Sequence, residues 1–364
     1  MSQIPFIDLK AQYELVKPQM KEAIDKVLEH GQYIMGPELK ELESKLSEFT
    51  GAKHAIAVSS GTDALLLSMM ALGIKPGDEV IVPDFSFFAT AEMVELIGAT
   101  PIFVDIDPKI YNLDADLIEK NITSKTKAIV PVSLYGQCAD MDTINAVAKK
   151  HNLPVIEDAA QSFGATYKGK KSCNLSTLAG TSFFPAKPLG GYGDSGAVFT
   201  NDDDLAAKVR ELLNHGQQGR YNHTSIGING RCDTMQAAIL LVKLDLFPEE
   251  VRLRAQIGQR YTDHLKDLNL QTPRIADGCT SVYAQYTIEV NNRAEVQKKL
   301  QELGVPTSVH YPCVMSRQPV FSGKYPNQCP ISERAASRVM SLPMHPYLKE
   351  DVQDQIISKI KEIL

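Results

Sequence analysis

A lysine between two prolines is the most unusual chemical feature of the sequence. Lys187 follows an aromatic run and directly precedes Pro188, in the stretch F-F-P-A-K-P-L-G. Because the residue before a proline is disfavoured in the α region, Lys187 is expected on a turn. Lysines are rarely buried unless they are paired or used, and the apolar flanks argue against an ordinary surface lysine. The stretch therefore indicates an amine that takes part in chemistry.

Two further stretches place polar groups where a ligand can reach them. In S-S-G-T-D-A-L (59–65), hydroxyls and a glycine open a predicted helix, and such a helix start can bind an anion through its free N–H groups. In P-V-I-E-D-A-A-Q-S-F-G (154–164), Asp158 ends an apolar strand, where ligands sit in open α/β sheets. Each stretch also has a plainer explanation: an ordinary helix cap.

Gly191, Gly193 and Gly196 spell G-x-G-x-x-G, the spacing of a dinucleotide-binding loop. That loop must open a helix, but here the strand-like run A-V-F-T (197–200) follows. The spacing is therefore interpreted as a coincidence, which disfavours an NAD-dependent sugar dehydrogenase. We expect these glycines to give room to Lys187 and its cofactor.

Together, the three stretches meet the needs of pyridoxal 5'-phosphate. This cofactor requires a phosphate cradle, a carboxylate that keeps its ring nitrogen protonated, and a lysine that forms a Schiff base. Its ring also needs an aromatic face, which the segment F-S-F-F-A-T (85–90) offers. The combination is far more specific than any one stretch alone.

The same motifs resemble those of the DegT/StrS family of nucleotide-sugar aminotransferases, and the resemblance extends essentially from end to end. S-S-G-T-D-A-L, P-V-I-E-D-A-A-Q-S-F-G, S-F-F-P-A-K-P-L-G and Y-G-D-S-G-A stand where the family's motifs stand. The stretches G-Q-Y-I-M-G-P-E, P-V-S-L-Y-G-Q-C-A-D and V-M-S-L-P-M-H-P-Y-L are similar to the branch that aminates UDP-3-keto-glucuronates for O-antigen synthesis. Ser195 and Gly230 depart from the family pattern, and the second could alter substrate or dimer contacts.

The resemblance implies roles for individual residues. Lys187 matches the Schiff-base lysine and Asp158 the partner of the ring nitrogen; these two are the expected catalytic residues. The other expected cofactor contacts are Gln161 for the ring hydroxyl, Phe87 (or Phe88 beside it) for stacking, and Gly61, Thr62, Ser182 and Asn229 for the phosphate.

Asn229 matches an asparagine that reaches across from a neighbouring subunit, so the resemblance implies a homodimer with shared active sites. Glu92, Arg231, His310 and Tyr311 match positions that bind the sugar substrate. Plainer roles stay open for these: His310 and Tyr311 as strand residues, and Arg231 as part of an interface ion pair.

The implied reaction moves an amino group from L-glutamate to a UDP-keto-sugar, with the C3 ketone of UDP-2-acetamido-2-deoxy-3-oxo-glucuronate as the expected acceptor. The family also contains dehydratases in which histidine replaces the lysine, so Lys187 favours transamination. Two alternatives remain: an aminotransferase for a 4-keto-6-deoxy sugar nucleotide, and a non-catalytic regulatory protein that binds pyridoxal phosphate.

The elements that must position these residues follow an alternating pattern. Between about 52 and 200, short apolar runs that include 154–158 and 181–184 alternate with helical periodicity, which is typical of an α/β domain with a mostly parallel sheet. Two helices within 9–50 precede it. The predicted fold is that of the fold-type-I aminotransferases: a large domain, 1–247, with a seven-stranded sheet, and a smaller α+β domain, 248–364, with strands at 281–290 and 306–311.

Composition sets the remaining expectations. The net charge of −6 argues against nucleic-acid binding, and no apolar stretch is long enough for a membrane span. The six cysteines form no C-x-x-C pair, so no metal site is expected and reduced thiols fit better. The first residues do not form a signal peptide, and a cytoplasmic enzyme is therefore predicted.

Overall fold

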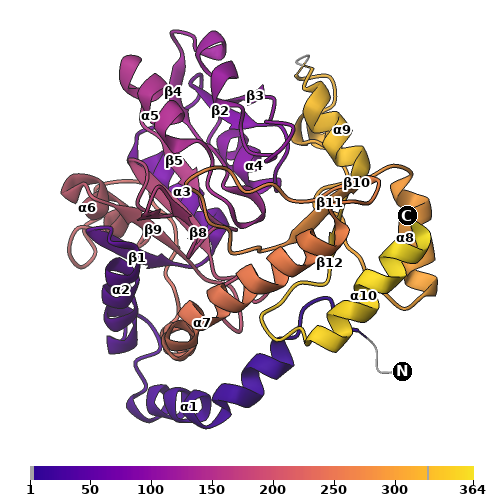
Figure 1. The fold of residues 1–364 in the computed structure, drawn as a ribbon. Coiled ribbons are helices and arrows are strands. Elements are labelled where there is room, and N and C mark those ends of the chain that lie inside the picture. Colours follow the sequence, from indigo (N-terminus) through magenta and orange to yellow (C-terminus); the bar gives the residue numbers. More distant parts are fainter. Residues whose placement is uncertain (1–3, 326–327) are drawn as a thin grey trace.

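The computed structural model describes residues 4–325 and 328–364. Helices α1 (Leu9–His30) and α2 (Pro37–Thr50) lead into the sheet (Figure 1). Asp8 caps the start of α1 by accepting from the Ala11 N–H at 2.8 Å. Both helices end at glycines in the left-handed conformation that glycine tolerates, Gly31 and Gly51. The two lead-in helices predicted within 9–50 are thus confirmed.

A seven-stranded sheet forms the centre of the molecule. A three-stranded set of order β3-β2-β4 and a four-stranded set of order β5-β8-β9-β1 are joined by parallel bridges, Ile129 to Val155 and Val132 to Asp158. Only β9 runs antiparallel to its neighbours, so the predicted mostly parallel sheet is confirmed. The strands are β1 (His54–Val58), β2 (Glu79–Pro83), β3 (Thr100–Val104), β4 (Thr126–Ile129), β5 (Ile156–Asp158), β8 (Leu178–Ser182) and β9 (Gly196–Thr200).

Helices cover both faces of this sheet, as the alternation in β1 requires. Ile56 and Val58 point into one apolar core, shared with α3 (Gly61–Ala71), α4 (Ala89–Leu96) and α6 (Asp203–Leu212). Ala55 and Ala57 point into the opposite core, shared with α2 and α7 (Thr234–Leu265). Successive residues of a strand face opposite sides, so a continuous apolar run indicates a strand buried on both.

Smaller elements connect the strands. Helix α5 (Met141–Lys150) precedes β5, and the hairpin β6 (Thr166–Tyr167) and β7 (Lys170–Lys171) precedes β8. Short 3-10 turns lie at Ala115–Leu117, Glu119–Asn121, Leu134–Gly136, Met315–Arg317 and Pro319–Phe321.

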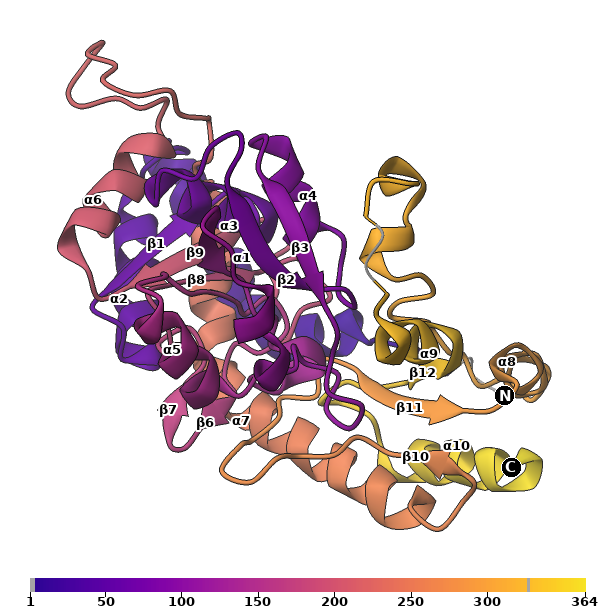
Figure 2. The same ribbon diagram turned by 90° about the horizontal axis from the view of Figure 1, so that it is seen from above.

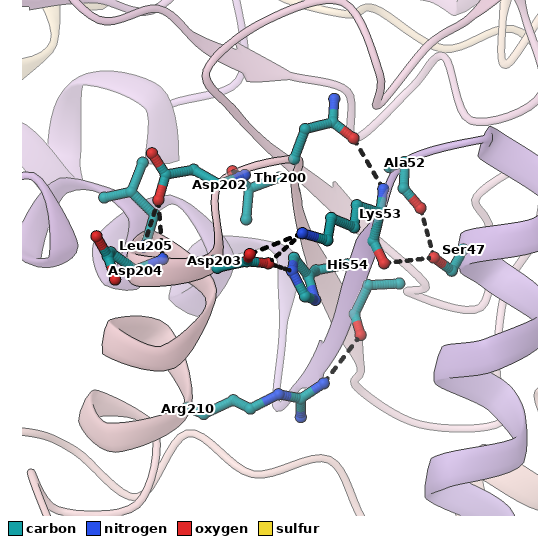
Figure 3. A network of polar contacts seen from close by, with 12 residues as sticks. Ser47, Ala52, Lys53, His54, Thr200, Asp202, Asp203, Asp204, Leu205 and Arg210 are labelled. Carbon is teal, nitrogen blue, oxygen red and sulfur yellow. Dashed lines mark hydrogen bonds and ion pairs between the residues drawn. The ribbon is translucent and has the colours of Figure 1, made fainter.

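A polar network fixes α6 against the outer strand β1 (Figure 3). Asp202 caps α6 by accepting from the N–H groups of Asp204 and Leu205 at 2.9 and 3.0 Å. Asp203 pairs with Lys53 at 2.7 Å and with His54 at 2.6 Å. The start of α6 is thereby tied to the start of β1.

The C-terminal elements gather on the side of the molecule away from α6 (Figures 1 and 2). An antiparallel sheet of order β10-β11-β12 packs with the surrounding helices around a separate apolar core. Its strands are β10 (Leu270–Gln271), β11 (Tyr286–Val290) and β12 (Val339–Leu342), and its helices are α8 (Arg293–Glu302), α9 (Pro330–Arg338) and α10 (Glu350–Ile363).

Helix α7 runs without a break through the boundary predicted between 247 and 248. It contributes Phe247 to the core beneath the large sheet, and Tyr261 and Leu265 to the C-terminal core. The division into two domains stays a prediction.

Three predicted strands differ from the structure. The strand expected at 181–184 ends at Ser182: the Phe183 N–H still donates to the Ser195 carbonyl at 2.8 Å, but its own carbonyl accepts from the Gly191 N–H at 2.7 Å as the chain turns. The segment 306–311 is irregular and pairs only through Ser308, which bridges to Ser341. The strand expected over 281–290 begins only at Tyr286. Aromatic and β-branched residues suit strands, but here they pack in turns.

Candidate active site

A cavity of about 450 Å³ opens at the carboxyl ends of the central strands, between the large sheet and the C-terminal segments. Most of the residues expected in the site line it together: Gly61, Thr62, Phe87, Asp158, Gln161, Ser182, Lys187, His310 and Tyr311. They come from stretches far apart in the sequence. The sheet topology brings them to one edge, as the rule for open α/β sheets predicts.

Lys187 lies half-buried on the turn that leaves β8. Its backbone N–H donates to the carbonyl of Phe184 at 2.8 Å, which closes the turn. Burial lowers the pKa of the Lys187 amine, and the Asp158 carboxylate opposes that shift. An amine that loses its proton more easily is a better nucleophile.

Asp158 is the last residue of β5 and is buried. Burial raises the pKa of its carboxyl, while hydrogen bonds and the Lys187 charge oppose the rise. Thr90 Oγ1 donates to Oδ2 at 2.8 Å, and the Ala160 N–H donates to Oδ1 at 3.1 Å. These donors stabilise the charged form of a carboxylate that would otherwise be costly to bury.

The start of α3 is the expected phosphate cradle. Ser60 caps the helix by accepting from the Asp63 N–H at 3.0 Å. Within the described residues, no hydrogen bond uses the N–H groups of Gly61 or Thr62. A Cβ on Gly61 would lie 2.6 Å from Cβ of Ser182, so only glycine fits this close approach. The cavity therefore meets free N–H groups at a helix N-terminus, beside a serine hydroxyl.

Hydrogen bonds orient Gln161 at the cavity wall. The Tyr135 N–H donates to Oε1 at 2.7 Å, and Nε2 donates to the Tyr311 hydroxyl at 3.1 Å. Burial raises the pKa of the Tyr311 hydroxyl, so it stays protonated. Burial lowers the pKa of His310 to about 4, and its Nδ1 lies 2.9 Å from Oγ of Ser341. Neither His310 nor Tyr311 lies in a regular strand.

The structure separates the two aromatic candidates. Phe87 lines the cavity with 53% of its surface exposed, and its ring centre lies 5.9 Å from that of Tyr311. Phe88 turns away and packs on Phe321 at 5.4 Å. Phe87 is therefore the available face.

Three expected site residues lie outside the lining of this cavity in the single chain. Glu92 is exposed on α4, and Asn229 is exposed beside Asn214. Arg231 donates to Oδ1 of Asn214 at 2.7 Å, although its buried Nε has no partner among the described residues. Their expected roles stay predictions.

The role expected for the glycines is wrong in one respect. Gly191 and Gly193 make room for the side chain of Gln236, not for Lys187: an added Cβ would lie 2.7 Å from its Oε1 and 2.8 Å from its Nε2, respectively. Gly196 allows β9 to pass the Ser60 backbone, 2.6 Å from an added Cβ. As expected, a strand follows Gly196, so the dinucleotide interpretation stays rejected.

Sequence reasoning also missed Thr90 and Gln236. Thr90 follows the aromatic pair that was singled out, which was a usable signal. Gln236 lies 43 positions or more from the glycines that it contacts, so no local pattern connects them.

The described residues hold neither a metal cluster nor a membrane span. No group of three or more histidine, cysteine or carboxylate side chains there could hold a metal ion. No helix within them combines the length and apolar character of a membrane span.

The chain belongs to the DegT/DnrJ/EryC1/StrS aminotransferase family, whose sequence profile matches residues 15–361. A relative from Pseudomonas aeruginosa, UDP-2-acetamido-2-deoxy-3-oxo-D-glucuronate aminotransferase, is 57% identical and aligns over 95% of this chain and 96% of its own. A relative from Geobacillus stearothermophilus, described as a pleiotropic regulatory protein, is 46% identical over 99% of this chain and 98% of its own.

Solved structures agree. The family aminotransferase from Brucella abortus superposes with a TM-score of 0.95 at 44% identity, covering 98% of each chain. NtdA from Bacillus subtilis, solved with bound cofactor PMP, superposes with a TM-score of 0.92 at 32% identity, covering 100% of this chain and 85% of its own. The predicted family and its fold-type-I architecture are thus confirmed.

Proposed function

We propose that this chain uses pyridoxal 5'-phosphate to move an amino group from L-glutamate to the C3 ketone of UDP-2-acetamido-2-deoxy-3-oxo-glucuronate. The observation that carries the cofactor assignment is the meeting of Lys187, Asp158 and the start of α3 in one cavity. The substrate assignment rests on the 57% identical relative from Pseudomonas aeruginosa. The proposed setting is cytoplasmic synthesis of O-antigen precursors.

The residues present fit the cofactor. The start of α3 can lie against Ser182 only because position 61 lacks a Cβ, and the free N–H groups there suit a phosphate. Asp158 offers a buried carboxylate to a protonated ring nitrogen, Gln161 an amide to the ring hydroxyl, and Phe87 an exposed ring face. When bound, pyridoxal phosphate supplies an aldehyde to which amines add and a ring that withdraws electrons.

The chain's own residues carry the proton chemistry. Lys187 would hold the cofactor through Nζ, and its free amine would take up and release a proton at Nζ. Burial lowers the pKa of this amine, which favours its neutral, proton-accepting form. Asp158, in its charged form, would hold the proton on the ring nitrogen; Thr90 and Ala160 donate hydrogen bonds to its two oxygens. His310 and Tyr311 contact the sugar side.

We propose a homodimer as the working form. The family resemblance implies that Asn229 reaches the phosphate of a neighbouring subunit, and its side chain is exposed and so accessible to a second copy. A second candidate function is a regulatory protein that binds the cofactor without catalysis; a 46% identical relative is described as a pleiotropic regulatory protein.

One assay separates these candidates. The purified protein, loaded with pyridoxal phosphate, is given L-glutamate and either a UDP-3-keto-uronate, made in situ by a coupled dehydrogenase, or a 4-keto-6-deoxy sugar nucleotide. The proposal requires an amino sugar from the first acceptor, no turnover by K187A, and normal turnover by the exposed-lysine control K170A. An amino sugar only from the 4-keto acceptor would move the substrate assignment. Cofactor binding without turnover on either acceptor would favour the regulatory candidate.

A further inference from the structure

Gln236, near the start of α7, inserts its amide into the loop of residues 190–193 that follows Lys187, called here the glycine loop. Its Oε1 accepts from the Tyr192 N–H at 2.9 Å. A Cβ at Gly191 or Gly193 would lie 2.7 or 2.8 Å from this amide, so the loop can close around it only with glycine on both sides of Tyr192. The pair of glycines is explained by the amide between them.

The ring of Tyr192 is held by the same helix. Lys243 lies seven residues after Gln236, two turns along and on the same face of α7. It is only 1% exposed, and its Nζ lies 4.9 Å from the centre of the Tyr192 ring. Lys243 forms no ion pair or hydrogen bond among the described residues; its charge meets the Tyr192 ring and interacts with the Glu250 carboxylate. Tyr13 of α1 packs edge-on against Tyr192 at 6.3 Å.

Short contacts make the glycine loop and the lysine turn one unit. The Gly191 N–H donates to the carbonyl of Phe183 at 2.7 Å, and the Lys187 N–H donates to that of Phe184 at 2.8 Å. A Cβ at Gly190 would lie 2.5 Å from the carbonyl oxygen of Pro185. These contacts join the backbone on either side of Lys187 to the loop that carries Tyr192, so we expect a displacement of Tyr192 to shift Lys187.

We propose that Gln236 is a positioning residue for Lys187: it fixes Tyr192 through the backbone, and thereby sets the burial of the lysine amine beside Asp158. This inference rests on the proposed function only in taking Lys187 as the reactive amine. Its effect is visible in protein without cofactor, because burial is what holds the pKa of Lys187 below its ordinary value.

The test measures acetylation of Lys187 by acetic anhydride in cofactor-free protein, across pH, by mass spectrometry of the peptide. In this reaction the neutral amine displaces acetate and loses one proton. Q236M keeps the length of the side chain and removes the acceptor; it is expected to raise the pKa of Lys187 and slow its acetylation at pH 7 by about 10-fold. Q236E keeps an oxygen acceptor and is expected to restore most of the rate. Q259M, on the exposed face of α7, is the control.

A double-mutant cycle adds a second, independent readout. G193A forces a Cβ against the Gln236 amide and should slow acetylation as Q236M does. In the Q236A background that Cβ meets no amide, so G193A should then add little. The proposal would be overturned if Lys187 were acetylated at the wild-type rate in Q236M, or if Q259M lost as much of that rate as Q236M. Additive effects of G193A and Q236A would also overturn it. None of these outcomes depends on turnover, so a failure of the proposed function is recognised separately.

Discussion

The hydroxyl of Thr90 donates a hydrogen bond of 2.8 Å to Oδ2 of Asp158, and so connects the start of α4 to the carboxylate at the end of β5. Removing this donor should raise the pKa of Asp158 further, because burial already raises it and the hydrogen bond opposes that shift. A buried charged group that loses such a bond is destabilised by about 1.5–3 kcal/mol. T90V should therefore bind pyridoxal phosphate roughly 10- to 100-fold more weakly at pH 7.

The measurement is the dissociation constant of pyridoxal phosphate, by absorbance titration of cofactor-free protein. T90S keeps the hydroxyl and should bind nearly as wild type does. Equal affinities of T90V and wild type would contradict a supporting role for Thr90.

The cradle at the start of α3 predicts a phosphate-specific defect. G61A places a methyl group 2.6 Å from Cβ of Ser182, so the helix start or the serine must move. Affinity for pyridoxal phosphate should fall about 100-fold, a loss of about 2.7 kcal/mol. Affinity for pyridoxal, which lacks the phosphate, should change much less. G304N, at a glycine with open space around it, is the control; equal losses for both ligands in G61A would argue against a phosphate at this position.

Stability at acid pH should depend on His345. This side chain is 3% exposed, and burial lowers its pKa from 6.5 to about 4. The folded state therefore binds the proton more weakly than the unfolded chain, and the stability present above pH 6.5 is lost as the pH falls from 6.5 to 4. The loss is up to about 3 kcal/mol. H345L should remove this contribution to the pH dependence of stability measured by urea unfolding, whereas H264L, at an exposed histidine, should follow wild type.

Asp84 should act with the opposite sign. Burial raises its pKa from 3.8 to about 6, although the N–H and hydroxyl of Ser316 both donate to it at 2.7 Å. The folded state holds the proton more tightly, so stability is lost as the pH rises from 3.8 to 6, by up to about 3 kcal/mol. D84N can keep both contacts to Ser316 without the charge.

Unfolding free energies at pH 4 and pH 7 test this expectation. D84N should gain stability over wild type at pH 7 but not at pH 4, and the exposed-site control D267N should gain none at either pH. A D84N variant that is less stable than wild type at pH 7 would contradict the expected destabilisation by the buried Asp84 charge.

Local chemistry explains which parts of the site the sequence could predict. Lys187 and Asp158 were predictable because each stands at an element boundary with a strong signal beside it. Lys187 directly precedes a proline, and Asp158 ends an apolar strand. The start of α3 carried a recognisable cap. These signals depend on neighbours in the chain, and the motif resemblance joined them into a family that the comparisons confirm.

Other features depend on contacts between distant segments. The amide of Gln236 reaches the glycine loop only through the packing of α7 under the large sheet, and the hydroxyl of Thr90 reaches Asp158 only through the parallel order of the strands. The end of β8 was misplaced for a related reason: aromatic residues after Ser182 suit a strand, but their hydrogen bonds close the lysine turn instead. Neither periodicity nor propensity contains this information.

Helix α7 has a mechanical consequence for the whole molecule. Its 32 residues form one helix of about 48 Å. This helix packs into both apolar cores and contacts the lysine turn near one end. The C-terminal strands cannot rotate against the large sheet unless α7 bends or leaves one of the two apolar cores. Cutting the chain near residue 247 would divide α7, so neither fragment is expected to fold stably by itself.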